Sequence, residues 1–368
     1  MRASWRWLVF GAVLATVLFG WSPLERRLRA VELLERLSQP ALLAKPPGVV
    51  TEELSIPGRS GLIRARLYFP AGGKPRPGVV VVHGVHFRGI DERRLVPFAR
   101  ALAASGLTVL TPELRDLADY RITASGVEVI RDAVRYLPTR RDRVTASKIG
   151  LIGFSFAGGL SLVAAEEPQT AARLASVTSV GGHHDLRRVL RFLVHGEIET
   201  PSGVVHQKAH EYGLVVLLYG SLENFVSEVD LPALRATFKA WLQEDRKAAR
   251  EAAKACTTPE AQRLWHLLEK QQLQTLAPEL DALLERQRGP LSALSPAGHL
   301  KALHLPVYLL HGAHDSVIPP SETDAANLEL DGAEHEALVS PLVEHVEVGK
   351  AARLGDKLAL VAFLAKLL

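Results

Sequence analysis

The chain has 368 residues, of which 47% are hydrophobic, and its formal net charge is +4. A chain of this length and composition can bury one large core together with an accessory domain. Because the basic residues are spread out and largely matched by acidic ones, the composition excludes the basic patch of a typical nucleic-acid-binding protein. Since Cys256 is the single cysteine, an intrachain disulfide is also excluded.

The amino-terminal segment combines a basic start with an apolar run. Arg2 and Arg6 precede an uncharged stretch, 7–21, which begins and ends with the interfacial residue tryptophan. Such a pattern is also typical of a signal peptide, but no A-x-A cleavage site follows it. We therefore expect residues 1–22 to be an uncleaved membrane anchor and residues 23–48 to be a linker helix. Export after signal cleavage, or an apolar helix packed on the globular body, are the alternatives.

Two alternating segments and one apolar run come next. Residues 51–56 and 63–69 alternate polar and apolar side chains, which predicts an antiparallel pair of half-exposed strands. Residues 77–82 are mostly apolar and lead into His83 and Gly84, as is typical of a buried parallel strand that ends in a loop.

Strand and helix patterns then alternate along the chain. Helical spacing over 94–102 and 126–137 encloses a strand pattern at 107–110, and a further strand pattern covers 174–180. This alternation predicts an α/β three-layer sandwich with a mostly parallel sheet. Ligands of such sheets bind beyond the carboxyl ends of the strands.

A serine lies between a predicted strand, 148–152, and a predicted helix, 159–165, that opens on small residues. A nucleophile elbow places its serine in a strained strand-to-helix turn, so the positions two before and two after must be small. Gly153 and Ala157 meet this demand around Ser155. The alternative is that Ser155 merely fills a tight turn.

Two later strand patterns end beside residues suited to the same chemistry. The apolar pattern 305–310 leads into a loop that contains Asp315, and the pattern 336–344 is followed directly by His345. Residues 354–368 predict an amphipathic helix that packs on the sheet. A helix-capping or turn-capping role is the alternative for Asp315.

Ser155, Asp315 and His345 follow the chain order of an α/β-hydrolase triad. Together with the His-Gly loop, these residues make the chain resemble a serine hydrolase of the α/β-hydrolase superfamily. The nearest branches are the dienelactone-hydrolase-like proteins and the lipases and esterases. The resemblance covers roughly residues 50–185 and 302–368.

The resemblance implies a role for each member of the triad. Ser155 would be the nucleophile, His345 the base that takes its proton, and Asp315 the group that orients the imidazole. Three other histidines are near in sequence, but only His345 follows the last strand: the rivals are His311, His314 and His335.

The resemblance also implies an oxyanion hole that is made of backbone amides. Its donors would be the amides of Phe156 and Val85, with His86 as the neighbouring candidate for the second donor. Three histidines at strand ends, His86, His183 and His184, are expected to line the substrate pocket. For the last two, a plain strand-to-loop exit is the alternative.

The region 186–300 interrupts the hydrolase pattern and is too long for a simple connection. Its part 231–288 is rich in helix-forming residues, and the resemblance implies a helical cap or lid that shapes the pocket and excludes water. The hydrolase core would then comprise residues 49–185 and 301–368. A structural or partner-binding insertion is the alternative.

No cofactor or metal is predicted. The histidine-containing run 206–211 lacks the H-E-x-x-H pattern, no P-loop is present, and no G-x-G-x-x-G follows a strand. The chain is therefore expected to be a serine hydrolase that cleaves an ester or related acyl bond of a small-molecule substrate. The alternatives are a peptidase or acyltransferase on the same fold, and a non-catalytic scaffold.

Overall fold

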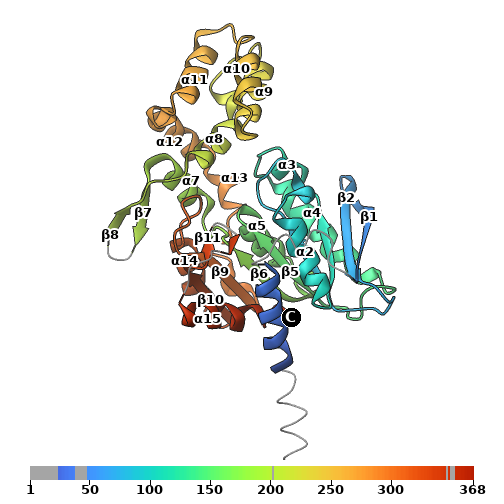
Figure 1. Ribbon diagram of the computed structural model, residues 1–368. Helices are drawn as coiled ribbons and strands as arrows, with labels where there is room; N and C mark the ends of the chain where they lie inside the picture. The colour runs from blue at the N-terminus through green and yellow to red at the C-terminus, as the bar shows by residue number, and fades with distance from the viewer. Residues whose placement is uncertain (1–23, 38–47, 201–202, 345–346, 349–352) are drawn as a thin grey trace, which may run out of the picture.

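The computed structural model describes residues 24–37, 48–200, 203–344, 347–348 and 353–368. Its centre is an eight-stranded sheet in the order β1-β2-β4-β3-β5-β6-β9-β10, with helices on both faces (Figure 1). The strands are β1 (Val49–Gly58), β2 (Gly61–Pro70), β3 (Gly78–Val82), β4 (Thr108–Pro112), β5 (Ile149–Phe154), β6 (Leu174–Val180), β9 (Val307–Gly312) and β10 (His335–Ser340).

The sheet is parallel except at one edge. β1 pairs antiparallel with β2, and β2 pairs antiparallel with β4. From β4 through β3, β5, β6 and β9 to β10, every pair is parallel. The carboxyl ends of these strands therefore meet along one edge, where the predicted mostly parallel α/β sheet places its ligands.

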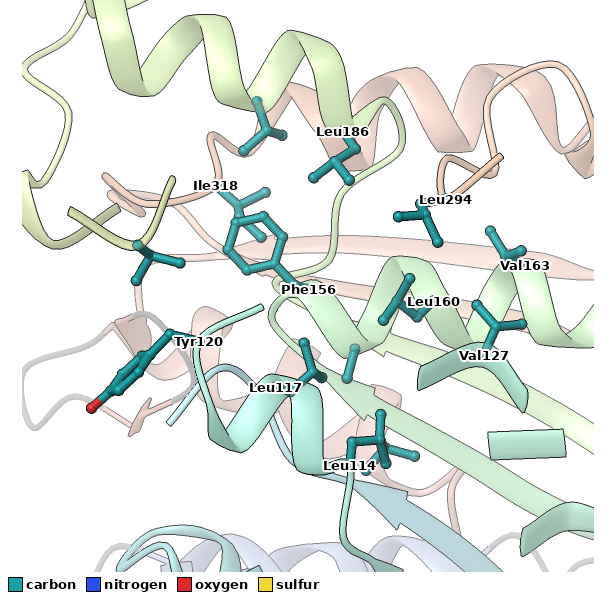
Figure 2. Close-up of a cluster of buried hydrophobic side chains, with 14 of the residues drawn as sticks. Leu114, Leu117, Tyr120, Val127, Phe156, Leu160, Val163, Leu186, Leu294 and Ile318 are labelled. Carbon is teal, nitrogen blue, oxygen red and sulfur yellow. The ribbon is translucent and has the colours of Figure 1, made fainter. Parts of the chain in front are cut away.

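Strand β3 shows how the sheet separates two apolar layers. Val80 and Val82 belong to one buried cluster, whereas Val79 and Val81 belong to the other. Because successive side chains of a strand point to opposite faces, a wholly apolar strand needs helices on both sides. Part of the first layer, around helix α5, is shown in Figure 2.

The helices that flank the sheet are α2 (Leu95–Ala104), α3 (Arg115–Ala118), α4 (Ala124–Tyr136), α5 (Phe156–Ala165), α6 (Pro168–Ala171), α14 (Ser321–Glu329) and α15 (Leu354–Leu364). Among them, α2, α4, α5 and α15 correspond to the four predicted ones, and α3, α6 and α14 were not predicted. Short 3-10 turns lie at η2 (Gly89–Asp91), η3 (Leu137–Thr139) and η6 (Leu300–Ala302).

The last strand is shorter than its sequence pattern predicted. The expected strand 336–344 ends at Ser340 in β10, and Val343–Glu344 form a separate strand, β11, that pairs with β12 (Glu347–Val348). Pro341 explains the break, because proline lacks the backbone N–H that a continuous ladder requires.

Between β6 and β9 the chain forms a mainly helical region, which we call the cap. In Figure 1, α9 to α12 gather at one end of the molecule, above the sheet. Its elements are α7 (Leu186–His195), β7 (Glu197–Thr200), β8 (Gly203–His206), α8 (Glu211–Tyr219), η4 (Leu222–Asn224), α9 (Leu231–Leu242), α10 (Arg246–Ala253), α11 (Pro259–Glu269), η5 (Leu273–Leu276), α12 (Ala277–Arg286) and α13 (Arg288–Ser292).

Local capping defines several of these cap helices. The Asp185 carboxylate accepts a hydrogen bond from the amide of Arg188 at the start of α7, and Gly196 ends the helix at φ 69°. Thr258 caps α11 in the same way, followed by proline at the first helical position. These are the preferred residue types at helix starts and ends.

A further helix covers residues 24–37 and buries Ala30 and Leu33 in the second apolar layer. Among the helices that the structure describes, none is both long and apolar enough to cross a membrane. Residues 1–22, which we expect to be a membrane anchor, lie outside the described residues.

Candidate active site

Ser155 occupies a strained turn between β5 and α5. Its backbone has φ 54° and ψ −134°, a combination that a non-glycine residue adopts at a cost of about 1–3 kcal/mol. The side chain is 6% exposed and lines a cavity. This is the geometry that the sequence predicted for a nucleophile elbow.

Glycines allow the turn to close. A Cβ on Gly153 would lie 2.3 Å from the carbonyl oxygen of Ala157, and one on Gly158 would lie 2.4 Å from the hydroxyl of Ser179. Strand and helix therefore approach too closely for any larger residue at either position. The Cβ of Ala157 is fully buried within the same packed layer.

The loop after β3 passes directly over the serine. A Cβ on Gly84 would lie 3.1 Å from the Cβ of Ser155 and 3.3 Å from the carbonyl oxygen of Phe154. Val85 and His86 follow Gly84 and line the same cavity as Ser155. Phe156 begins α5, so its amide is among the N–H groups that have no partner within the helix.

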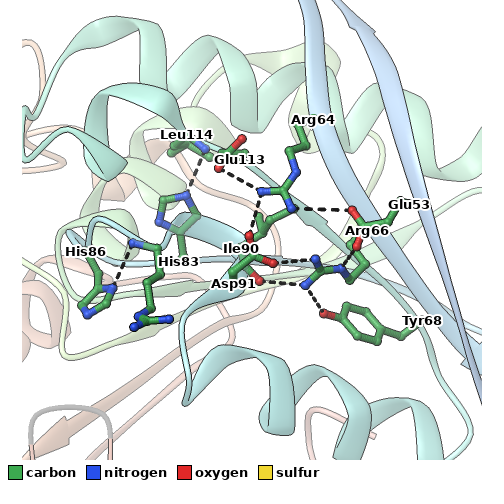
Figure 3. A network of polar contacts seen from close by, with 11 residues as sticks. Glu53, Arg64, Arg66, Tyr68, His83, His86, Ile90, Asp91, Glu113 and Leu114 are labelled. Atoms are coloured by element: carbon green, nitrogen blue, oxygen red, sulfur yellow. Dashed lines mark hydrogen bonds and ion pairs between the residues drawn. The ribbon is translucent and has the colours of Figure 1, made fainter.

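His83 fixes this loop from within the core. Its Nε2 accepts a hydrogen bond of 3.0 Å from the amide of Leu114 (Figure 3). The ring proton therefore lies on Nδ1, which donates to the Gly84 carbonyl at 2.7 Å. Burial lowers the pKa of His83 to about 4. The neutral tautomer that these two bonds require is therefore the stable one near neutral pH.

Charged groups hold the far end of the same loop. Arg66 Nη1 donates to the carbonyl of Ile90 at 3.2 Å and pairs with Asp91, which also accepts a 2.9 Å hydrogen bond from Arg64 (Figure 3). These arginines come from β2, so the loop is tied to the antiparallel edge of the sheet. Burial also lowers the pKa of His86.

Asp315 lies in the loop after β9 and is 2% exposed. Its Oδ1 accepts hydrogen bonds from the amides of Val317, at 2.8 Å, and Ile318, at 3.1 Å. Nε2 of His311 lies 3.6 Å from Oδ2. A buried carboxylate with these backbone donors is held in one orientation.

The predicted base, His345, lies outside the described residues. The strand before it, β11, ends at Glu344, and Val343 lines the cavity that contains Ser155. The rival His311 uses both ring nitrogens elsewhere, on Thr323 at 2.7 Å and on the carbonyl of Ile318 at 2.9 Å.

Another rival, His335, begins β10 and pairs in register with Val307, the first residue of β9. It therefore lies at the amino ends of the parallel strands, away from the edge that carries Ser155. Its Nδ1 lies 2.8 Å from the carbonyl oxygen of Ala333.

His183 and His184 were expected to line the pocket but are not among the residues that line the cavity. Both rings instead contact neighbouring parts of the fold. The ring of His183 packs against Gly159, where an added Cβ would lie 2.3 Å from Cε1, and its Nε2 lies 2.9 Å from the carbonyl oxygen of Leu294. Nε2 of His184 lies 2.6 Å from a carboxylate oxygen of Glu329. The glycine at position 159 is the one signal in the sequence that could have indicated that a bulky side chain, here His183, packs against the start of α5.

The cavity beside Ser155 has a volume of about 330 Å³ and mostly apolar walls. Its walls come from the loop after β3, from α2, from β11 and α15, and from Leu37 of the helix 24–37. The contributions of α2, α15 and that helix to the cavity wall were not predicted from the sequence. The additional lining residues are Glu92, Arg93, Arg94, Leu95, Pro97, Phe98, Phe154, Val180, Leu310, Leu360, Leu364 and Leu367.

The cap was expected to shape this pocket, but the described residues that line the cavity all lie outside 186–300. The cap instead contacts the loops that carry the candidate residues, through hydrogen bonds from residues 207–212. Within the described part of the chain, no group of three or more histidine, cysteine, aspartate or glutamate side chains is placed to hold a metal ion.

Two curated mouse proteins resemble part of the chain. The peroxisomal succinyl-coenzyme A thioesterase of Mus musculus is 34% identical over 112 residues, which are 30% of this chain and 25% of that protein. Acyl-coenzyme A thioesterase 3 of Mus musculus is 31% identical over 134 residues, 35% of this chain and 30% of that protein. The matches thus span less than a third of either relative. No protein-family model matches the chain.

Solved structures show the fold. The rice cell wall degrading esterase LipA from Xanthomonas oryzae superposes with a TM-score of 0.55 at 16% identity, covering 89% of this chain and 93% of that one. A 2,6-dihydroxy-pseudo-oxynicotine hydrolase superposes with a TM-score of 0.50 at 18% identity, covering 86% of this chain and 68% of that one. With its mostly parallel sheet and its serine at the turn after β5, the chain has the α/β-hydrolase fold.

Proposed function

We propose that the protein is a serine hydrolase that cleaves an ester or related acyl bond through an acyl-enzyme on Ser155. One observation carries the proposal: Ser155 lies in a strained strand-to-helix turn on the wall of a largely apolar cavity. Strain of this kind persists where the surrounding structure enforces it, and it concentrates at functional sites. Asp315, buried and hydrogen-bonded after β9, supports the same function.

In the proposed reaction, His345 takes the proton from the Ser155 hydroxyl as the oxygen attacks the acyl carbon. The proton then passes from His345 to the leaving group as its bond to the acyl carbon breaks. Water, deprotonated by the same imidazole, then attacks the acyl carbon. The bond from the acyl carbon to the Ser155 oxygen breaks, the imidazole returns its proton to that oxygen, and the acid is released. Asp315 holds the imidazole in the required tautomer and stabilises its cationic form.

The negative charge that develops on the acyl oxygen needs donors that are already in place. The amide of Phe156 is suited to this role, because it lies at the first position of α5, where the helix dipole favours negative charge. The amide of Val85 is the proposed second donor, since His83 holds the carbonyl of the same peptide group.

The substrate proposed for this site carries an apolar acyl group. Leucine is the commonest residue of the cavity wall, and burying a methylene there stabilises binding by about 0.8 kcal/mol. Both curated relatives are named as thioesterases for coenzyme A esters, so acyl thioesters stand beside simple esters as candidate substrates.

A fluorophosphonate probe tests the proposal, because it reacts with an activated serine. The protein freed of residues 1–22 is expected to become labelled, whereas Ser155→Ala and His345→Ala are expected to remain unlabelled. Labelling that persists in His345→Ala would show that another residue is the base. An unlabelled parent protein would favour the non-catalytic scaffold.

Matched substrates separate the remaining alternatives. A nitrophenyl ester, the anilide with the same acyl group and the corresponding acyl thioester would be compared under identical conditions. Faster cleavage of the anilide would identify a peptidase, and transfer of the acyl group to an added alcohol in preference to water would identify an acyltransferase.

We also propose that residues 1–22 attach the protein to a membrane. Support comes from the basic start and the apolar run 7–21, and from the exposed side chains of Leu24, Leu28 and Val31 on the helix that follows. Extraction of membranes with alkaline carbonate tests this attachment. The full chain is expected in the pellet, and a variant that lacks residues 1–22 in the supernatant; recovery of the full chain in the supernatant would refute it.

A further inference from the structure

The loop that carries the proposed second oxyanion donor is held from two sides. On the core side, Nδ1–H of His83 donates to the carbonyl of Gly84 at 2.7 Å. On the cap side, the hydroxyl of Tyr212 donates to the carbonyl of Val85 at 3.0 Å. These two carbonyls belong to the peptide groups on either side of the Val85 α-carbon, so together they fix the direction of the Val85 N–H.

Tyr212 belongs to a short stretch of the cap, residues 207–212, that also reaches the acid loop. Nε2 of Gln207 donates to the carbonyl of Asp315 at 3.0 Å. The amide of His210 donates to the carbonyl of Ser316 at 2.8 Å. We call residues 207–212 the bridging segment, because it is hydrogen-bonded to the loops after both β3 and β9.

The bridging segment is itself well ordered by its neighbours. His210 caps α8, its Nδ1 accepting from the amide of Tyr212 at 3.2 Å. The ring of Tyr212 packs edge-on against Tyr120, with ring centroids 6.4 Å apart. Burial raises the pKa of Tyr212, so its hydroxyl keeps the proton that it donates to Val85.

We propose that Tyr212 is a positioning residue for catalysis, because its hydroxyl orients the oxyanion-hole amide of Val85. The inference deepens the proposed function and rests on it. It also gives the cap a role that does not require its residues to line the pocket. Through the bridging segment, the cap holds the loop of the oxyanion donor and the loop of the acid at a fixed separation. Tyr212 itself touches no reacting atom.

The geometry defines what loss of the hydroxyl does. Without it, one of the two peptide groups flanking Val85 loses its fixed partner, so the amide points at the developing oxyanion less of the time. Complete removal of an oxyanion donor costs about 10²–10³ in kcat. A misdirected donor costs less, and we expect about a tenfold loss.

Tyr212→Phe and Tyr219→Phe form a matched pair for the test. Both tyrosines are in α8 and pack against Tyr120, but the hydroxyl of Tyr219 donates to Asp119 at 3.1 Å and not to the catalytic loops. For each variant, kcat and KM with a nitrophenyl ester, the Ki of a trifluoromethyl ketone and the unfolding temperature would be measured. The ketone forms a tetrahedral oxyanion on the serine, so its affinity reports on the oxyanion hole.

Tyr212→Phe is expected to lower kcat about tenfold, leave KM within twofold and weaken the ketone by the same factor as kcat/KM. Tyr219→Phe is expected to have the wild-type kcat, KM and ketone Ki. Unchanged kinetics in Tyr212→Phe, or equal losses in both variants, would overturn the inference while the proposed function stands. A wild-type protein that neither turns over ester nor binds the ketone would overturn both.

Discussion

Gly84 and Ser155 lie so close that a Cβ added to Gly84 would stand 3.1 Å from the Cβ of the serine. The loop that supplies the proposed oxyanion donor is thus packed against the proposed nucleophile itself. Because the contact is between backbone and a short side chain, neither partner can rotate away. Any added atom must displace the loop, the serine or both.

Gly84→Ala is therefore expected to reduce kcat/KM about tenfold or more, with little change in the unfolding temperature. The physical reason is a shift of a few tenths of an ångström between the serine and the Val85 amide, to which oxyanion stabilisation is sensitive. Gly289→Ala is the control, because an added Cβ there meets nothing within 4 Å. Full activity in Gly84→Ala would contradict this account of the loop.

The strain at Ser155 gives a second prediction. Ser155→Gly and Ser155→Ala both remove the hydroxyl of the proposed nucleophile, but only glycine adopts a φ of 54° without steric cost. We expect the glycine variant to be more stable than the alanine variant by about 1 kcal/mol. Denaturant unfolding of the two variants measures the difference, and equal stabilities would argue that the turn is unstrained.

The buried His83 makes stability depend on pH. Its pKa is lowered to about 4 in the folded state, below the ordinary histidine value of 6.5 that applies in the unfolded chain. The unfolded chain therefore binds a proton more readily. The contribution of the neutral His83 side chain to the free energy of unfolding is therefore complete above pH 6.5 and is lost as the pH falls toward 4. The difference between these pKa values corresponds to roughly 3 kcal/mol.

Unfolding free energies at several pH values between 4 and 7 would test this linkage. The wild-type protein is expected to lose more stability across this range than His83→Gln, whose side chain does not titrate. Parallel pH dependences in the two proteins would show that His83 is not the group responsible. The variant is also expected to be less active, because the amide of Leu114 and the carbonyl of Gly84 lose their shared partner.

The cavity wall gives a prediction about acyl-chain length. Leu367 is half-buried and lines the cavity, so Leu367→Phe is expected to reduce its volume. The ratio of octanoate to acetate ester hydrolysis should fall severalfold, with acetate turnover nearly unchanged. Leu358→Phe is the control, because Leu358 lies on α15 but is 60% exposed and not part of the wall. A ratio that does not change would place the acyl chain elsewhere.

The fold and the elbow were predictable because their signals are local. A run such as Gly78–Val82 is apolar at every position, and this suits only a strand that is covered on both faces. The small residues around Ser155 are a steric requirement that can be read directly from neighbouring positions. Asp315 follows a strand in the same way, so its location at the carboxyl edge of the sheet was also predictable.

The parts of the pocket wall that come from α2, α15 and the helix 24–37 were not predictable, because their residues are distant in sequence from the serine. The pattern of α15 predicts that one face of the helix is buried, but not that Leu360 and Leu364 face a cavity rather than solid core. For His183 the sequence left two locations open, because a histidine at a strand end suits both a pocket wall and a hydrogen-bonded position in the core. Its contact with Gly159 depends on how the elbow helix packs, which the sequence pattern does not contain.

The composition of the cavity has a consequence for how the proposed activity can diversify. Among the described residues, the groups proposed to break the bond lie on the loops after β3, β5 and β9, whereas part of the proposed acyl wall comes from Leu360 and Leu364 of α15 and from Leu37 of the helix 24–37. Substitutions in those two helices can therefore change which acyl groups fit without altering the reacting geometry. A shortened protein that began after residue 37 would keep Ser155 and Asp315 but lack Leu37, so the proposed chemistry and the proposed acyl selectivity depend on different parts of the chain.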